Sequence, residues 1–334
     1  MVLSTHEVNL MLEDKKIKKD TYKLIKYSDE VKEKAINLGN ILNRSSIIKI
    51  LSELREEEKI PDGTSNYNFI KYMVDILDMF DEVVIFDERK GSTVTRYVAK
   101  YIAVSPYEIA LSLLSKSFLS HYSALYVHDI TINNPKDIYI NKEQSKKPNK
   151  KEHKQITQGR IDYAFSKKMR ATTMVYNFQY KGEFFRVHVL NSKNTQNTGI
   201  IFKQPINFSK KIKVTNLERT LIDVVVRPQY SGGVKEILDS YIRAKKQLNI
   251  NKLIKYLDKF DYSYPYFKSI LFFLKYANYN PKILDDFRKK YDKDLNNNVN
   301  FYLDYQIVRK NLDKNIGIYY PAFLTESGHD IKRN

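Results

Sequence analysis

The segment VVIFDERKGSTVTRYVAKYIAV at residues 83–104 decides the fold of the N-terminal part of this chain. Its two arms, Val83–Phe86 and Thr93–Val104, are rich in β-branched and aromatic residues. They flank a polar turn at residues 87–92 that contains Gly91. This pattern predicts a β-hairpin.

Three helical patterns precede the hairpin, at about residues 31–42, 45–59 and 67–79. Apolar residues recur in them at helical spacing, and Pro61 and Gly63 separate the second from the third. Three helices followed by a hairpin are typical of a winged helix-turn-helix, in which the third helix enters the major groove of DNA. A small α/β packing module without nucleic acid has the same pattern, so both interpretations stay open here.

If the N-terminal part, which we call the head, forms a winged helix at residues 31–104, one group of its side chains faces the groove and a second group contacts the DNA backbone. The first group comes from the third helix and the second from the hairpin: Tyr67, Asn68, Lys71 and Tyr72; Arg89, Lys90, Ser92 and Arg96.

Composition narrows the function classes. The 334 residues contain no cysteine, which excludes disulfides and thiolate metal sites, and the six histidines include no HExxH pair, so we expect no metal or cofactor. No apolar run approaches the roughly 18 residues of a membrane span, and the N-terminus reaches charged residues too early for a secretory leader. We therefore expect a cytoplasmic protein without a membrane partner.

The net charge of +18 favours a polyanionic partner. Residues 1–104 hold 17 Lys and Arg against 18 Asp and Glu, residues 105–228 hold 21 against 9, and residues 229–334 hold 19 against 12. The head is therefore near neutral, whereas the body is basic.

The body begins with a helix start at Ser105, Pro106 and Glu108, and strand-like segments follow between residues 136 and 214. A nearly all-polar run at residues 142–160 predicts a loop, which either contacts phosphate groups or is a solvated insertion. Its basic candidates are Lys146, Lys147, Lys150, Lys151 and Lys154.

From these patterns we expect an α/β (α+β) protein with four parts. They are an N-terminal helix or arm at 1–30, a winged helix at 31–104, a basic domain with a mostly antiparallel sheet at 105–228, and a C-terminal helical bundle at 229–334. We also expect the part that begins near Ser105 to fold alone.

Two segments carry a family resemblance. FLSHYSALYVHDIT with PKDIYI lies within Phe118–Ile140, and VTNLERTLIDVVVRPQYSGGVKEIL spans Val214–Leu238. Together they resemble the AbiEi family of antitoxins from abortive-infection systems. The resemblance implies a non-enzymatic autorepressor that binds its own promoter DNA and counteracts a nucleotidyltransferase-like toxin without needing a stable complex.

The residues of these motifs favour a structural role. Arg219 and Asp223 are i,i+4 partners on one predicted helix, Thr215 is positioned to cap that helix, and the glycine pair suits a turn. No GxSxG surrounds the serine of the first segment, which argues against a hydrolase. The motif residues are Ser123, His128, Glu218, Arg219, Asp223, Gly232 and Gly233.

Two other classes stay open from the residues alone. One is a metal-dependent nuclease in which Asp137, Asp162 and Glu183 hold Mg²⁺, although they form no compact motif. The other is a protein-only adaptor that senses a phage component.

Overall fold

The computed structural model describes residues 26–146, 156–295 and 299–326. The chain forms two compact units that alternate along the sequence. Within the described residues, the first comprises 26–113, 176–185 and 204–211, and the second comprises 114–146, 156–175, 186–203, 212–295 and 299–326. Two segments from the middle of the sequence thus complete the N-terminal unit.

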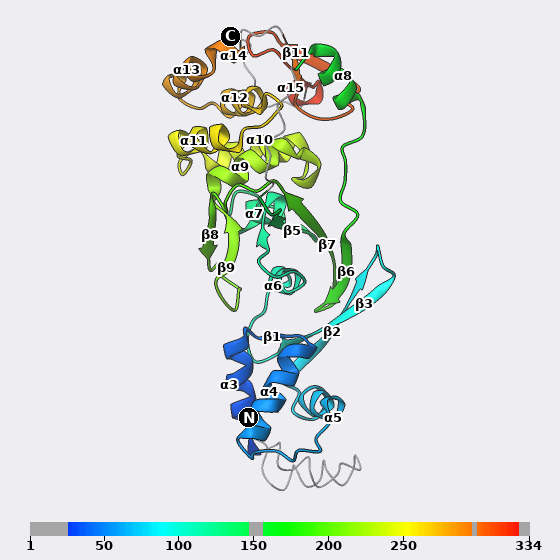
Figure 1. The fold of residues 1–334 in the computed structure, drawn as a ribbon. Coiled ribbons are helices and arrows are strands. Elements are labelled where there is room, and N and C mark those ends of the chain that lie inside the picture. The colour runs from blue at the N-terminus through cyan, green and yellow to red at the C-terminus, as the bar shows by residue number, and fades with distance from the viewer. Residues whose placement is uncertain (1–25, 147–155, 296–298, 327–334) are drawn as a thin grey trace. The chain divides into compact units, whose positions relative to one another are not determined.

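Helices open the first unit and a β-hairpin follows (Figure 1). Strand β1 pairs with β3 through Ile41 and Val98, β3 pairs with β2, and β2 pairs with β6, all antiparallel. The elements are α3 (Ser28–Leu38), β1 (Ile41–Leu42), α4 (Arg44–Glu56), α5 (Asn66–Lys71), the π-helix η1 (Tyr72–Ile76), β2 (Phe80–Asp87), β3 (Ser92–Ala99), α6 (Pro106–Leu111) and β6 (Val175–Tyr180).

Side-chain caps set the starts of these helices. Asn43 Oδ1 accepts a hydrogen bond from Ser46 N at 2.9 Å at the start of α4, and Ser65 Oγ accepts one from Asn68 N at the start of α5. At α6 the expected capping box of Ser105 and Glu108 is present. Local sequence signals therefore place these boundaries.

The sheet of the second unit has the strand order β7-β5-β4-β9-β8. Strands β5 and β7 are parallel, as are β4 and β9, whereas the other described pairs are antiparallel. The sheet is therefore mixed where a mostly antiparallel one was predicted, because its parallel neighbours are distant in sequence and short alternating segments do not specify such pairs. The strands are β4 (Phe118–Leu119), β5 (Asp137–Glu143), β7 (Glu183–Ser192), β8 (Ile200–Lys203) and β9 (Ile212–Thr215).

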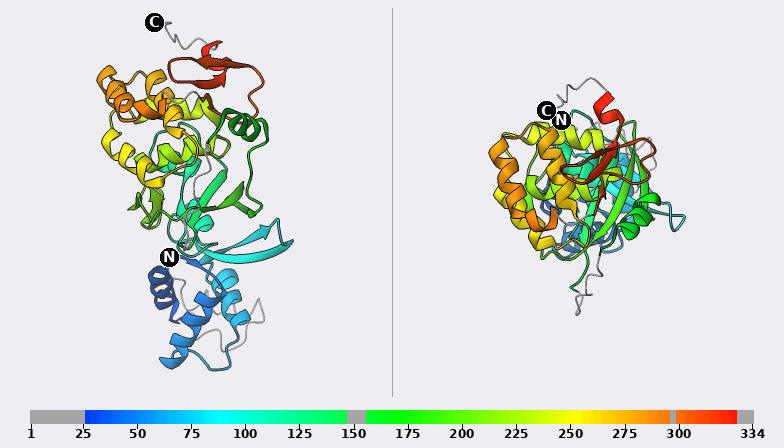
Figure 2. Two further views of the ribbon diagram at one scale, coloured as in Figure 1. Left: turned by 45° about the horizontal axis from the view of Figure 1, so that its top comes forward. Right: turned by 90° about the horizontal axis from the view of Figure 1, so that it is seen from above.

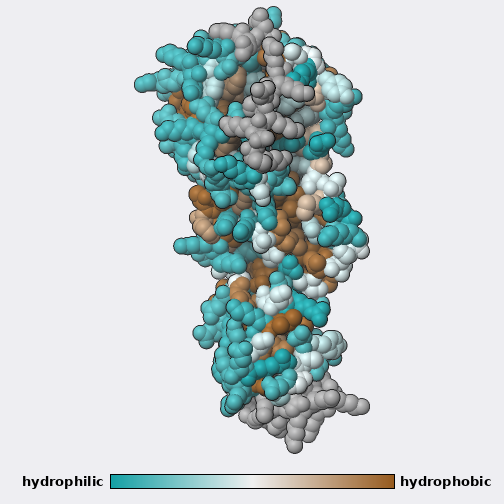
Figure 3. All heavy atoms as spheres, in the orientation of Figure 1, coloured by the Kyte–Doolittle hydropathy of each residue, from teal (hydrophilic) through white to brown (hydrophobic). Residues whose placement is uncertain are grey.

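A succession of helices packs on this sheet and on itself around one large apolar core. Leu253, Leu257 and Phe260 of α11 are buried, whereas Lys255 and Lys259 of the same helix are exposed. The outer surface over α11 and α13 is mostly hydrophilic in Figure 3. The helices are α7 (His121–Val127), α8 (Gln158–Ser166), α9 (Leu217–Val226), the 3₁₀ turn η2 (Pro228–Tyr230), α10 (Gly233–Ala244), α11 (Ile250–Phe260), α12 (Tyr266–Tyr276), α13 (Pro281–Lys290), α14 (Asp292–Leu295) and α15 (Phe323–Glu326).

The C-terminal region also contains a small sheet, so the prediction of an entirely helical tail is wrong. Strands β10 (Phe301–Tyr302), β12 (Ile318–Pro321) and β11 (Lys310–Asp313) lie in that order beside α12 (Figure 2). The residues of β10 and most of those of β12 are aromatic or β-branched, whereas β11 is Lys-Asn-Leu-Asp, and the turn between β11 and β12 ends at Gly317, which has a φ of 70°. The strands are only two to four residues long, which hides their periodicity in the sequence.

Within the residues given structure here, no helix combines the length and apolar character needed to span a membrane.

Candidate functional site

Three of the four predicted groove-facing residues lie on α5, and the fourth, Tyr72, begins the π-helix η1. Tyr67 is 70% exposed, and Asn68 and Lys71 are also exposed. Tyr72 is only 1% exposed and belongs to the core, so the expectation that it faces outward is wrong. Tyr72 and Met73 follow the buried Phe69 by three and four residues, so all three lie on one inward helix face, and the helix continues in π geometry with Leu77 N donating to Tyr72 O.

The hairpin turn presents Arg89, Lys90 and Ser92, which are all exposed. Asp87 Oδ1 accepts hydrogen bonds from Arg89 N and Lys90 N at 3.0 and 3.1 Å, which fixes the turn.

Arg96 differs from the other hairpin residues. Its Nε donates to Ser112 Oγ and its Nη2 donates to Ser112 O, both at 3.0 Å, and burial lowers its pKa. Because its guanidinium is engaged by the end of α6, Arg96 is held within the first unit. The expectation that it is a free backbone-contacting residue is therefore wrong.

The basic loop is described only at its start. Lys146 is exposed. Lys147, Lys150, Lys151 and Lys154 lie outside the described residues.

The first family motif ties helix α7 to two strands. Ser123 is fully buried, and its Oγ accepts a hydrogen bond from Tyr139 N of β5 at 2.8 Å. The Nε2 of His128 lies 2.6 Å from Thr215 O of β9, and burial lowers the pKa of this histidine. Ser123 thus connects α7 to β5, and His128 connects the end of α7 to β9.

The second motif starts α9 and α10. The cap of α9 is Asn216, whose Oδ1 accepts from Arg219 N at 3.1 Å; Thr215 instead bonds to the Thr220 hydroxyl, so its predicted capping role is wrong. Glu218 is 5% exposed and pairs with Lys252 at 3.0 Å.

The glycine pair begins α10, as the sequence indicates. Gly232 and Gly233 have φ values of 78° and 84°. A Cβ on Gly232 would lie 2.9 Å from Glu236 Cγ, so this turn needs glycine for space as well as for conformation.

Arg219 is the centre of a buried polar network. Its Nη1 donates to Glu143 Oε1 at 2.9 Å and to Thr198 O at 2.6 Å, and its Nε lies 3.5 Å from Asp223 Oδ2. The guanidinium also lies between the rings of Phe118 and Phe260, at 5.2 and 5.4 Å from their centroids.

Two carboxylates in this network have pKa values that are shifted in opposite directions. Burial raises the pKa of Asp223 to about 6 despite the nearby Arg219. Burial would also raise the pKa of Glu143, but hydrogen bonds from Thr195, Asn197 and Arg219 outweigh it and lower that pKa. Glu143, Thr195 and Thr198 were not predicted, because the sequence gives no sign that they approach Arg219.

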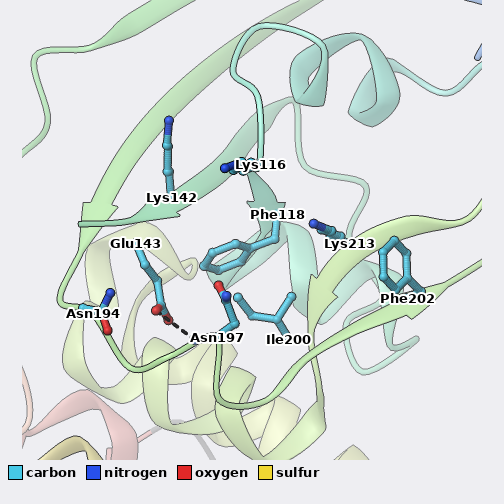
Figure 4. A pocket seen from close by; sticks show the side chains of 9 residues that line it. All are labelled: Lys116, Phe118, Lys142, Glu143, Asn194, Asn197, Ile200, Phe202 and Lys213. Atoms are coloured by element: carbon cyan, nitrogen blue, oxygen red, sulfur yellow. Dashed lines mark hydrogen bonds between the residues drawn. The ribbon is translucent and has the colours of Figure 1, made fainter. Parts of the chain in front are cut away.

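A pocket of about 430 Å³ opens beside this network, entirely within the second unit (Figure 4). We call it the lysine pocket. Its lining residues are Lys116, Phe118, Lys142, Glu143, Asn194, Asn197, Ile200, Phe202 and Lys213. Phe202 and Lys213 pair across β8 and β9, two strands that the sequence pattern indicates. This pairing is the part of the pocket that the sequence hints at.

A second unpredicted cluster joins histidines to tyrosines in the same unit. His121 is 5% exposed, has a left-handed backbone with φ of 52°, and accepts or donates one hydrogen bond with Ser120 Oγ at 2.9 Å. Its ring packs edge-on against Tyr230, and Tyr139 stacks on His188. Burial, together with the charges of Arg227 and Arg219, lowers the pKa of His121 to about 3.

The carboxylates considered for Mg²⁺ have separate partners. Asp137 Oδ1 lies 2.7 Å from His188 Nε2, and Asp162 accepts hydrogen bonds from Gln158 and Tyr302. Glu183 begins β7. The described ranges contain no group of three or more His, Asp or Glu residues that could hold a metal ion.

Comparisons with known proteins give one informative result. No family model matches the chain, and no curated protein sequence matches it. The fold is similar to the crystal structure of the RV2827C protein from Mycobacterium tuberculosis, with a TM-score of 0.51 and 12% identity, over 88% of this chain and 90% of that one. The mixed α/β architecture is thus shared with a solved protein along most of both chains.

Proposed function

We propose that this protein is a DNA-binding antitoxin of the AbiEi type, which represses its own promoter and counteracts a nucleotidyltransferase-like toxin. The observation that carries the DNA-binding part is the order and pairing of elements in the first unit. From residue 26 onward, the α-helices α3, α4 and α5 and the π-helix η1 precede the β2–β3 hairpin, and the short β1 between α3 and α4 pairs with β3. A winged helix-turn-helix has this arrangement.

The exposed side chains support the same proposal. Tyr67, Asn68 and Lys71 on α5 are suited to base edges and phosphates, and Arg89 and Lys90 in the turn are suited to the DNA backbone. The near-neutral charge of residues 1–104 does not oppose this, because these cations stand on the two elements that would contact DNA.

The antitoxin part rests on the sequence motifs of the second unit. The motif residues Arg219, Ser123 and His128 make hydrogen bonds that connect helices to strands, so we infer that these motifs stabilise the fold of this unit. We therefore place toxin neutralisation on the surface of the second unit, which has the basic charge.

The test measures binding of the full chain to the DNA directly upstream of its own gene by fluorescence anisotropy and footprinting. We expect a protected inverted repeat, and weaker binding by the variant Lys71→Glu/Arg89→Glu/Lys90→Glu. The control Lys255→Glu/Lys259→Glu/Lys289→Glu carries the same charge change on exposed positions of α11 and α13. Equal affinities of the two triple variants would refute the assignment of this face.

Neutralisation is tested separately, by co-expressing the chain from a foreign promoter with the product of the neighbouring gene. With the nucleotidyltransferase-like toxin that we expect the neighbouring gene to encode, growth should be rescued by the wild type and by the Lys71→Glu/Arg89→Glu/Lys90→Glu variant alike. Failure of the wild type to rescue would refute the antitoxin part and leave the DNA-binding part standing.

A further inference from the structure

The lysine pocket collects three cations from three elements. Lys116 precedes β4, Lys142 lies near the end of β5, and Lys213 lies on β9. Leu119 pairs with Val214 in the parallel strands β4 and β9, which sets Phe118 beside Lys213, and Lys213 pairs in turn with Phe202. Strand register therefore fixes the arrangement of Phe118, Lys213 and Phe202 across three strands.

The positive charge of this pocket is not cancelled from within. Its one carboxylate, Glu143, accepts hydrogen bonds from Arg219, from Thr195 through backbone and hydroxyl, and from Asn197 N. Glu143 is thus occupied by the buried network. In the parts of the chain that the structure describes, none of the three lysines forms an ion pair. Clustered ammonium groups without carboxylate partners favour a multiply charged anion.

The rest of the lining favours a flat ring. Phe202 is 67% exposed, and Lys213 Nζ lies 5.5 Å from its ring centroid, so the cationic and aromatic sides of the pocket meet at Lys213. Ile200 adds apolar surface, and Asn197 brings a side-chain amide to the same pocket (Figure 4), whereas the amide of Asn194 is held by Gln144 O and Gln196 N. Aromatic rings stack on bases, and amides bond to base edges.

We propose that the lysine pocket binds a single nucleotide, with its phosphates at Lys116, Lys142 and Lys213 and its base against Phe202. The volume of about 430 Å³ lies in the range of small-molecule pockets. A nucleic-acid strand needs a groove that follows several nucleotides, which a pocket of this size is not. The site is independent of the DNA-binding face proposed above.

The experiment is calorimetric titration of the full chain with ATP, GTP, CTP and UTP, and with tripolyphosphate as the probe without a base. We expect saturable binding of at least one nucleotide, more tightly than tripolyphosphate. Lys142→Ala and Lys213→Ala should each weaken nucleotide binding by about tenfold, as expected for the loss of a charge-assisted contact. Phe202→Ala should weaken nucleotide binding and leave tripolyphosphate binding unchanged.

The controls are Lys255→Ala and Lys289→Ala, which remove the same charge from exposed sites on α11 and α13. Circular dichroism of every variant separates lost binding from lost folding, and Phe202→Ala, at an exposed residue, provides a readout that survives if a lysine variant misfolds. Absence of saturable binding by all four nucleotides at millimolar concentration would overturn the proposal. So would tripolyphosphate binding as tightly as the nucleotides, or a single-stranded oligonucleotide binding far more tightly with the same dependence on Lys142 and Lys213.

Discussion

Arg219 and Glu143 form a buried ion pair with 2.9 Å between Nη1 and Oε1, although 76 residues separate them in the sequence. The pair connects helix α9 to the end of strand β5. Since the guanidinium is also held between Phe118 and Phe260, one side chain joins the sheet, the helices and the wall of the lysine pocket.

Replacing Arg219 with Ala should lower the free energy of unfolding by about 3–5 kcal/mol, because it leaves Glu143 and Asp223 buried without their cation. Urea unfolding followed by circular dichroism measures this. Arg219→Lys should recover part of the loss, since it restores the charge without the planar fork. Wild-type stability of Arg219→Ala would contradict the role assigned to this network.

His121 should make stability depend on pH. The pKa of His121 is about 3 in the folded chain and 6.5 in the unfolded chain. Between these pH values the unfolded chain therefore binds a proton at His121 that the folded chain does not bind. The contribution of neutral His121 to the free energy of unfolding is therefore fully present above pH 6.5. It is lost as the pH falls towards 3, by about 1.4 kcal/mol per pH unit at most. Asp223 has the opposite sign, with stability lost as the pH rises from 3.8 to about 6.

The variant His121→Asn separates these two groups. Asparagine tolerates the left-handed backbone at this position and does not titrate. We expect the stability advantage of the wild type over His121→Asn to shrink between pH 6.5 and pH 4, as measured by urea unfolding at each pH. Parallel stability curves over this range would show that His121 does not carry the effect.

Arg96 and Arg89 should behave in opposite ways. Arg96→Ala removes two hydrogen bonds to Ser112 and should lower stability by about 1–3 kcal/mol. Arg89→Ala, at an exposed residue, should change stability by less than about 0.5 kcal/mol and should weaken DNA binding. Thermal melting and anisotropy on the same two proteins test this, and equal melting temperatures would remove the structural role of Arg96.

A fragment that begins at Ser105 should not fold as an independent protein, contrary to what the sequence led us to expect. Strand β6 belongs to the first unit, where Phe178 pairs with Ile85 of β2. Removing residues 1–104 leaves β6 with an unpaired edge and exposes apolar side chains, which promotes aggregation. Gel filtration of the fragment measures this, and a monodisperse monomer with a cooperative melt would contradict it.

The sequence was informative where structure is decided locally. The hairpin around Gly91, the helices that start near Asn43 and Ser65, and the Arg219–Asp223 contact all follow from signals within a few residues. The burial of Tyr72 escaped prediction although Phe69, Tyr72 and Met73 follow the i, i+3, i+4 spacing of one buried helix face. Glu143 and the lysine pocket escaped because they depend on strands that pair across long stretches of sequence.

The division of the first unit among separate pieces of sequence also sets an order for folding on the ribosome. Its sheet lacks β6 until Tyr180 has been synthesised, which is 67 residues after Leu113 (180 minus 113). At roughly 5–20 residues per second, that interval lasts about 3 to 13 seconds. During it the open edge of β2 is available to chaperones and to neighbouring nascent chains, so we expect translation speed between residues 113 and 180 to influence the yield of native protein.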